Sequence, residues 1–277
     1  MFSLKATAGG VFLSCCLAAV SVSAQLESFE DPTPREARKQ KDEDPIEKLQ
    51  ERFANTVRAY KPVYIAYGHP DTKLQFSFRS ELSDVAPVNF AYSQIIFWQL
   101  GEDSKPFRDA TYTPEFFYRW SPSGDRWSAV DFGIWEHNSN GKAGADSRSY
   151  DQSYVRGIYS IHTRNFLASF ALKLRLLYNY DEENGDIQDY IGPFDLDIRL
   201  IGLFDFLLDQ SEVIFNLRPG GKFGTETDKG GYQISAKCHI RGLKINPAFY
   251  IQYYQGYAET LINYQQRVSE FRVGFVF

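Results

Sequence analysis

One short segment carries the residue types of nucleophilic catalysis: it reads Trp135-Glu136-His137-Asn138-Ser139. On a β-strand, residues i and i+2 share a face, so His137 and Ser139 would stand side by side. A neighbouring imidazole can accept the hydroxyl proton and make serine a usable nucleophile. A His-x-Ser pair also arises by chance, and a single histidine or serine on a strand is commonly only a polar lining residue.

A third polar side chain is needed to orient such an imidazole and to stabilise its charged form. Asp151 can take this role if residues 125–138 and 149–161 pair as adjacent antiparallel strands. The connection between them, from Asn140 to Arg148, would then return Asp151 to the neighbourhood of His137.

Apolar and polar residues alternate over most of the chain from residue 61 onward, which is typical of strands with two different faces. The runs reach about the nine to eleven residues that cross a bilayer, and the last one ends on Phe277. We therefore predict an all-β fold, a transmembrane antiparallel β-barrel of about twelve strands: 61–67, 73–82, 88–99, 111–120, 125–138, 149–161, 166–180, 195–206, 211–218, 231–240, 247–257 and 268–277.

Composition agrees with a membrane barrel without deciding the matter. Aromatic residues make up 16% of the chain and the mean hydropathy is −0.38, values that suit strands with one apolar face and aromatic girdles. A secreted β-sandwich or lipocalin-like barrel would give similar values. The net charge of −5 and the lack of a basic cluster indicate no nucleic-acid partner.

The N-terminal residues 1–24 have the features of a secretory signal peptide, with Lys5, an apolar run and the small residues Val22-Ser23-Ala24. A lipoprotein anchored at Cys15 or Cys16 is the alternative. Residues 25–59 form a charged polar tail and residues 60–277 the barrel. The mature chain would keep only Cys238, so we expect no internal disulfide.

The segment from His137 to Gly141, followed by Ser147-Arg148-Ser149 and a polar residue at 151, closely resembles the active-site segment of the outer membrane phospholipase A family. Upstream, Gln94, Trp98-Gln99-Leu100 and the run from Pro106 to Pro114 also resemble that family. The resemblance covers roughly residues 60–277. It implies calcium-dependent hydrolysis of the sn-1 and sn-2 esters of phospholipids and of lysophospholipids, by a homodimer in the outer membrane of a Gram-negative bacterium.

The resemblance also implies a role for each matching residue. Ser139 matches the nucleophile, His137 the general base and the backbone N–H of Gly141 an oxyanion donor. For Ca²⁺, it implies three oxygen ligands, which are the hydroxyl of Ser147, the backbone carbonyl of Lys142 and a carbonyl of Ser104 from the partner subunit.

This sequence departs from the family pattern at three positions of the same segment: Asp151 replaces an asparagine, Lys142 an arginine and Gly144 an acid. An acid at 151 is chemically sound, because aspartate orients histidine in other triads. Asp146 could compensate for Gly144. The acids 181–183 are either an additional weak calcium site or a solvated loop.

The strand 88–99 is the predicted dimer interface, because Gln94 lies in the middle of its apolar phase. An amide that faces lipid is costly unless it meets a partner. The alternative places Gln94 in the wet interfacial belt.

In the predicted strand 125–138, the apolar residues and the candidate catalytic residues belong to opposite faces. Val130, Phe132 and Ile134 are even-numbered, whereas His137 and Ser139 are odd, so an unbroken strand would turn the pair into the lumen. We predict a β-bulge between Ile134 and His137, with Trp135 or Glu136 as the extra residue, that turns the pair outward beside Asp151.

Two other kinds of protein fit parts of this pattern. A catalytically inactive outer-membrane barrel that acts as a small pore or adhesin would share the length and the polar inward face. A soluble secreted β-protein would share the alternation. The joint presence of His137, Ser139, Asp151, Ser147 and Gly141 favours the hydrolase.

Overall fold

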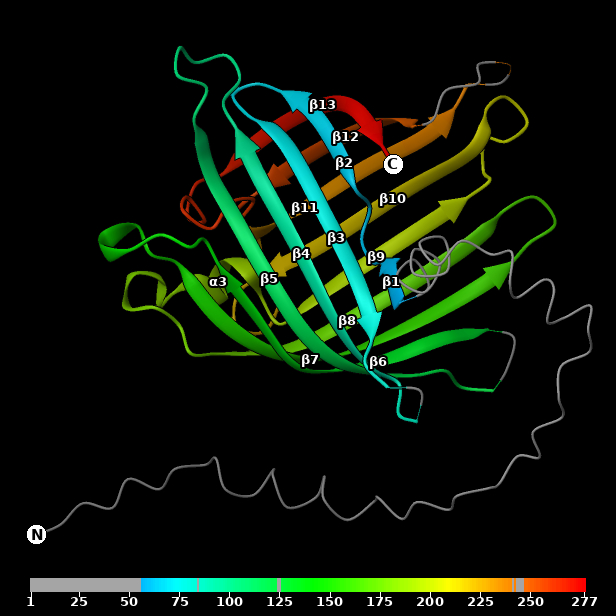
Figure 1. Ribbon diagram of the computed structural model, residues 1–277, viewed down its shortest axis with the longest axis horizontal. Helices are drawn as coiled ribbons and strands as arrows, with labels where there is room; N and C mark the ends of the chain where they lie inside the picture. Colours follow the sequence, from blue (N-terminus) through cyan, green and yellow to red (C-terminus); the bar gives the residue numbers. More distant parts are fainter. Residues whose placement is uncertain (1–55, 84, 124–125, 241, 243–246) are drawn as a thin grey trace, which may run out of the picture. The chain divides into compact units, whose positions relative to one another are not determined.

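The computed structural model describes residues 56–83, 85–123, 126–240, 242 and 247–277, and most of them lie in β-strands (Figure 1). Twelve strands form the barrel: β2 (Tyr64–Gly68), β3 (Thr72–Glu81), β4 (Val88–Trp98), β5 (Phe107–Trp120), β6 (Trp127–Ser139), β7 (Ser149–His162), β8 (Leu167–Tyr178), β9 (Phe194–Ile201), β10 (Asp209–Gly220), β11 (Glu226–His239), β12 (Ala248–Gly256) and β13 (Val268–Val276).

Each barrel strand pairs antiparallel with its neighbours in the chain, and β13 pairs with β2. The pairing of β3 with both β2 and β4 completes the ring. A closed sheet has no free edge, so its backbone groups are satisfied without water. The prediction of a transmembrane antiparallel barrel of twelve strands is confirmed.

Every predicted strand range overlaps one observed strand, although three ends differ by four or five residues. β11 begins at Glu226 rather than at 231. β5 begins at Phe107 rather than at 111, because its first residues continue the pairing with β4 beyond a register shift at Trp98. β9 ends at Ile201 rather than at 206. The next residues turn instead, because the Asp205 carboxylate accepts hydrogen bonds from the backbone N–H and the hydroxyl of Ser211, each 2.7 Å long.

The two faces of the sheet have opposite chemistry. The large apolar side chains that stay exposed lie mainly on the outer face, among them Leu176 at 76%, Phe271 at 60% and Ile134 at 58%. Many buried side chains are polar or charged. An apolar exterior around a polar interior is the arrangement that lipid requires.

Ion pairs fill the interior of the barrel. Glu259 binds Lys73 at 3.2 Å and Arg272 at 2.6 Å, and Asp131 accepts two hydrogen bonds from Arg119. Because buried charges are tolerated when they are paired, these contacts explain how the lumen holds so many of them.

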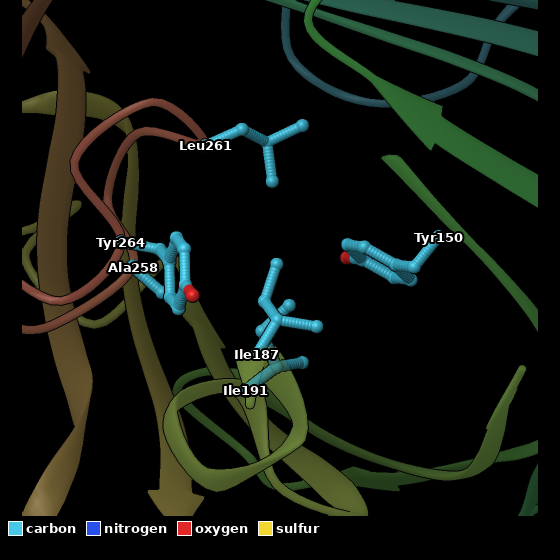
Figure 2. Close-up of a cluster of buried hydrophobic side chains, with 6 residues drawn as sticks. All are labelled: Tyr150, Ile187, Ile191, Ala258, Leu261 and Tyr264. Atoms are coloured by element: carbon cyan, nitrogen blue, oxygen red, sulfur yellow. The ribbon is translucent and has the colours of Figure 1, made fainter. Parts of the chain in front are cut away.

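A small apolar cluster lies inside one end of the barrel (Figure 2). It joins the short helix α3 (Ile187–Ile191) to Tyr150 of β7 and to the loop between β12 and β13; its members are Tyr150, Ile187, Ile191, Ala258, Leu261 and Tyr264. Burial, and then the neighbouring Asp186 carboxylate, raise the pKa of Tyr264, so its hydroxyl stays protonated and donates to Asp186. No helix among the described residues is long and apolar enough to span a membrane.

A short additional strand, β1 (Val57–Ala59), pairs with β3 opposite Phe78, Arg79 and Ser80. It continues along β3 beyond the end of β2. The sequence placed these residues in the charged tail, but they belong to the sheet. The predicted signal peptide and residues 25–55 of the tail lie outside the described residues, so both stay predictions.

Candidate active site

A β-bulge in β6 decides which way the candidate catalytic residues point. Gly133 pairs with Tyr154 of β7, but the next pair joins Glu136 to Gln152, so β6 carries one extra residue. On the other side, β5 pairs with Gly133 and Trp135 in succession and leaves Ile134 unmatched. The predicted slip of phase is confirmed, although it lies slightly earlier than expected, at Ile134 and Trp135.

The bulge exchanges the two faces of the strand. Before it, the odd-numbered residues Asp131 and Gly133 are buried; after it, Glu136 and Asn138 are buried, and His137 faces out with 35% of its side chain exposed. Ser153 donates a hydrogen bond of 2.9 Å to the carbonyl of Ile134. This contact satisfies a polar backbone group that would otherwise face lipid.

The register of β6 and β7 brings the predicted pair together, since His137 lies opposite Asp151 and Ser139 opposite Ser149. The Nδ1 atom of His137 is 2.7 Å from Oδ1 of Asp151. The indole of Trp135 stacks on the imidazole, with 5.8 Å between ring centroids and 12° between planes. The imidazole ring is therefore held at its edge by Asp151 and on its face by Trp135, with Nε2 on the side away from Asp151.

Ser139 lies at the end of β6, beside the predicted oxyanion donor. Its Oγ accepts a hydrogen bond of 3.2 Å from the backbone N–H of Gly141, the one hydrogen bond of this hydroxyl within the described part of the chain. Within the described residues no hydrogen bond joins this hydroxyl to His137, and hydrogen bonds between catalytic groups are often long before substrate binds. Gly141 has φ of +67°, and a Cβ there would lie 2.9 Å from the Tyr112 ring. Both constraints favour glycine.

The connection between β6 and β7 holds two of the predicted calcium ligands. Ser147 Oγ donates a hydrogen bond of 2.7 Å to the Asp181 carboxylate, so two hard oxygens of the kind that calcium prefers meet here. The Lys142 ammonium turns away and donates to the carbonyl of Arg108 at 2.9 Å. These residues fit a calcium ion, and Asp181 is the member of the predicted acidic group that lies beside them.

Ser104, the third predicted calcium ligand, does not lie beside the connection between β6 and β7. Ser104 is exposed in the connection between β4 and β5 and makes no hydrogen bond to the segment from Lys142 to Ser147 within the described residues. Its assignment through a partner subunit stays a prediction. Across the described residues, no group of three or more His, Cys, Asp and Glu side chains could hold a metal ion.

Asn140 shapes this loop, although the spacing of the motif predicted no role for its side chain. It is 3% exposed; its Oδ1 accepts from the backbone N–H groups of Lys142 and Arg148, and its Nδ2 donates to the carbonyl of Asp146. A single buried amide thus fixes both limbs of the loop beyond Ser139.

Ion pairing in the lumen supports the catalytic strand from behind. Glu136, next to His137 but on the inner face, binds Lys173 of β8 at 2.6 Å and accepts from Asn138 at 3.2 Å. Asn138 in turn accepts from Thr113 of β5 at 3.1 Å. The strand that carries the candidate catalytic residues is therefore tied to β5 on one side and, across the inner face of β7, to β8 on the other.

Comparison with known proteins identifies the family. The model of the phospholipase A1 family matches residues 34–277, which is most of the chain. The chain belongs to the phospholipase A1 family. It is 28% identical to phospholipase A1 of Escherichia coli K12 over 210 residues, or 71% of this chain, and 27% identical to a Neisseria meningitidis relative over 83% of this chain. It spans only 64% and 57% of the lengths of these relatives.

Solved structures of two outer membrane phospholipases share the fold. The Salmonella typhi enzyme, crystallised as a dimer with bound calcium, has a TM-score of 0.67 at 22% identity, with 84% of this chain and 96% of that one covered. Outer membrane phospholipase A from Escherichia coli has the same TM-score at 23% identity and covers 80% and 98%. At 22% and 23% identity, this likeness shows that the phospholipase A1 family member described here has the same barrel fold as these two enzymes.

Proposed function

We propose that this barrel hydrolyses phospholipid acyl esters, including the sn-1 and sn-2 esters and those of lysophospholipids, with Ser139 as nucleophile, His137 as general base and Asp151 as its partner. The observation that carries the proposal is the outward bulge of β6, which places the pair His137–Asp151, 2.7 Å apart, on the lipid-facing side. A site in the lumen could not receive a lipid from the bilayer. Membership of the phospholipase A1 family supports the choice of substrate.

The reaction uses two transfers of the acyl group. His137 Nε2 takes the proton of Ser139 as Oγ bonds to the ester carbon, and the N–H of Gly141 donates to the oxyanion. The ester C–O bond then breaks, and the leaving alcohol takes the proton from His137. Water, deprotonated by His137, attacks the acyl group on Ser139, and the fatty acid leaves as Ser139 regains its proton.

A calcium ion bound by Ser147 Oγ, with Asp181 and the Lys142 carbonyl, would supply positive charge next to the developing oxyanion. The proposal includes this ion because the Ser147–Asp181 contact gathers oxygen ligands a few residues from Ser139. The Salmonella typhi enzyme with bound calcium is a dimer, and we extend both features to this chain.

The test is release of fatty acid from mixed micelles of phospholipid and detergent by the refolded full chain. We expect hydrolysis in millimolar calcium and its loss in excess chelator. Absence of hydrolysis in calcium would overturn the proposal, and full activity in chelator would remove the metal from it.

Ser147→Ala should raise the calcium concentration that gives half-maximal activity by about tenfold, because one of few protein ligands is lost. Activity at saturating calcium should largely return. A calcium titration of fatty-acid release measures this, with Ser169→Ala of β8 as the matched control. An unchanged calcium requirement in Ser147→Ala would show that this hydroxyl does not bind the ion.

The proposed dimer uses the outer surface of β4. Gln94 lies opposite Tyr112 of β5, which lies opposite Ser139, so the amide is two strands from the nucleophile at the same level. The Tyr92 hydroxyl donates to Oε1 of Gln94 at 3.2 Å. Within the described residues, the side-chain N–H groups of Gln94 have no hydrogen-bond acceptor, and a second subunit could supply one.

An open apolar groove lies beside this amide. Its volume is about 260 Å³, and its walls come from β2, β3, β4 and the C-terminus; they include Ile65, Leu74, Phe76, Ile96 and Phe277. A groove of this kind on the lipid-facing surface can receive side chains of a second copy. We place the subunit interface over Gln94 and this groove.

Gln94→Ala should lower the affinity of the dimer about three- to thirtyfold. This is the range that one hydrogen bond between membrane helices contributes, and we expect a similar contribution between two barrels. Sedimentation equilibrium in detergent with calcium measures the dimer affinity. Leu174→Ala, on the exposed outer face of β8, is the control and should leave it unchanged. Equal affinities for Gln94→Ala and the native chain would contradict an interface on β4.

A further inference from the structure

Both oxygens of the Asp151 carboxylate are engaged, and one of the partners has no role in the reaction described above. Oδ1 lies 2.7 Å from Nδ1 of His137, and Oδ2 accepts a hydrogen bond of 2.8 Å from Nδ2 of Asn179. A carboxylate held at one oxygen can turn about its Cβ–Cγ bond, whereas one held at both oxygens presents a fixed edge to the imidazole.

The backbone of Asn179 explains how its amide reaches this side of the sheet. Asn179 follows β8 directly, after Tyr178 has paired with Asp151. By alternation it would face the lumen, like the buried Arg175. Its φ of +51° instead turns the chain into the left-handed region, which asparagine tolerates better than most residues. The turn carries the amide to the outer side.

The loop beyond Asn179 is firmly attached to β7. The N–H of Asp181 donates to the carbonyl of Ser149 at 3.1 Å, and the Asn184 side chain donates to the same carbonyl at 3.0 Å. The amide of Asn179 is thus presented from a segment that is itself anchored beside the triad. Such support is what keeps catalytic side chains within the narrow range of productive geometry.

From this geometry we propose that Asn179 is a positioning residue, which fixes the Asp151 carboxylate and through it the orientation of His137. The inference rests on the proposed function and deepens it, since it names a fourth residue on which the same site depends. We assign Asn179 no contact with Ser139 or with the reacting ester.

Asn179→Gly removes the amide and keeps the backbone, because glycine adopts a φ of +51° without strain. We expect kcat of the full-length refolded protein to fall about ten- to a hundredfold, the cost of small misplacement of catalytic groups, with KM for micellar phospholipid nearly unchanged. Asn179→Asp, which is almost isosteric but has no N–H, should lose at least the same factor. Native kcat in either folded variant would overturn the proposal.

A double-mutant cycle separates positioning from a general structural effect. If Asn179 acts through Asp151, then Asn179→Gly should change kcat less than about twofold in an Asp151→Ala background. The same ten- to hundredfold loss in both backgrounds would show that Asn179 acts by another route. The calcium concentration for half-maximal activity should stay at its native value in Asn179→Gly, and a large rise would point to the Ser147–Asp181 contact instead.

A covalent probe distinguishes failure of this inference from failure of the proposed function. An alkyl fluorophosphonate bonds through phosphorus to a nucleophilic serine oxygen, releasing fluoride, while the general base takes the hydroxyl proton. The native chain should be labelled, and Asn179→Gly should be labelled about ten- to a hundredfold more slowly. Absence of hydrolysis and labelling in the native chain would overturn the proposed function, and with it this inference. Equal labelling rates in the two proteins would overturn only the role of Asn179.

Discussion

Ser139→Ala should fold into the same barrel and hydrolyse phospholipid at least about ten thousandfold more slowly than the native chain, because the covalent step has no other nucleophile. Ser139 lies opposite Ser149 at the end of β6, next to the N–H of Gly141. Alanine removes only the hydroxyl at a partly exposed position, so the free energy of unfolding should change little. Fatty-acid release from mixed micelles in calcium measures the loss.

Ser128→Ala is the matched control, because Ser128 lies near the opposite end of the same strand, where its hydroxyl forms a hydrogen bond of 2.8 Å with the hydroxyl of Ser160. It should keep native activity. The change of mobility on heating, which marks a folded barrel in gel electrophoresis, checks both proteins. More than a small fraction of native activity in folded Ser139→Ala would refute its assignment as nucleophile.

His137→Ala should lose activity almost as completely, by about a thousandfold or more, since a serine hydroxyl without a base is a poor nucleophile. The imidazole is held by Asp151 at Nδ1 and by the Trp135 ring on its face, so it can act from one fixed position. The double variant of His137→Ala and Ser139→Ala should be no slower than Ser139→Ala alone, because the two residues act as a unit.

The control for this change is His162→Ala, at the far end of β7, where the side chain is exposed. The same micellar assay should give it native kcat. If His137→Ala retained a tenth of the native rate, another group would have to accept the proton of Ser139, and the role given to Asp151 would fall with it.

The alternation of side chains made the barrel predictable, because a strand in lipid must present apolar residues on one face only. The same rule exposed the conflict in β6, where Phe132 and His137 could not both face outward on a regular strand. It could not locate the extra residue, because insertion at any position from 134 to 136 gives the same phase at His137 and Ser139. Only the pairing with both neighbours identifies Ile134 and Trp135.

Residues outside the regular strands were harder to predict for a different reason. Asn179 reaches Asp151 because its backbone leaves the strand in the left-handed region, and alternation describes nothing beyond that point. The pairing of Val57–Ala59 with β3 likewise depends on the short length of β2, which leaves part of β3 open. Such contacts follow from the assembled barrel rather than from a local pattern.

The roles of Ser147, Lys142 and Ser104 rest on resemblance and stay predictions. The structure adds one contact that the residue types alone did not specify, between Ser147 and Asp181. These two residues are 34 apart in the chain, and they meet because the ends of β6, β7 and β8 lie at the same rim. The spacing of residues along the sequence does not show which strand ends meet at this rim. Before the fold was known, it could therefore not be decided which of the acids 181–183 lies beside Ser147.

Our proposal requires that the bulge in β6 brings Ser139 to the lipid-facing side as the nucleophile. The most direct measurement is to locate the serine modified by an alkyl fluorophosphonate added to the refolded native chain in phospholipid–detergent micelles with calcium, by mass spectrometry of the digested protein. We expect the phosphonyl group on Ser139, and none there in His137→Ala. A label on a different serine, or an unlabelled Ser139 in protein that releases fatty acid, would contradict it.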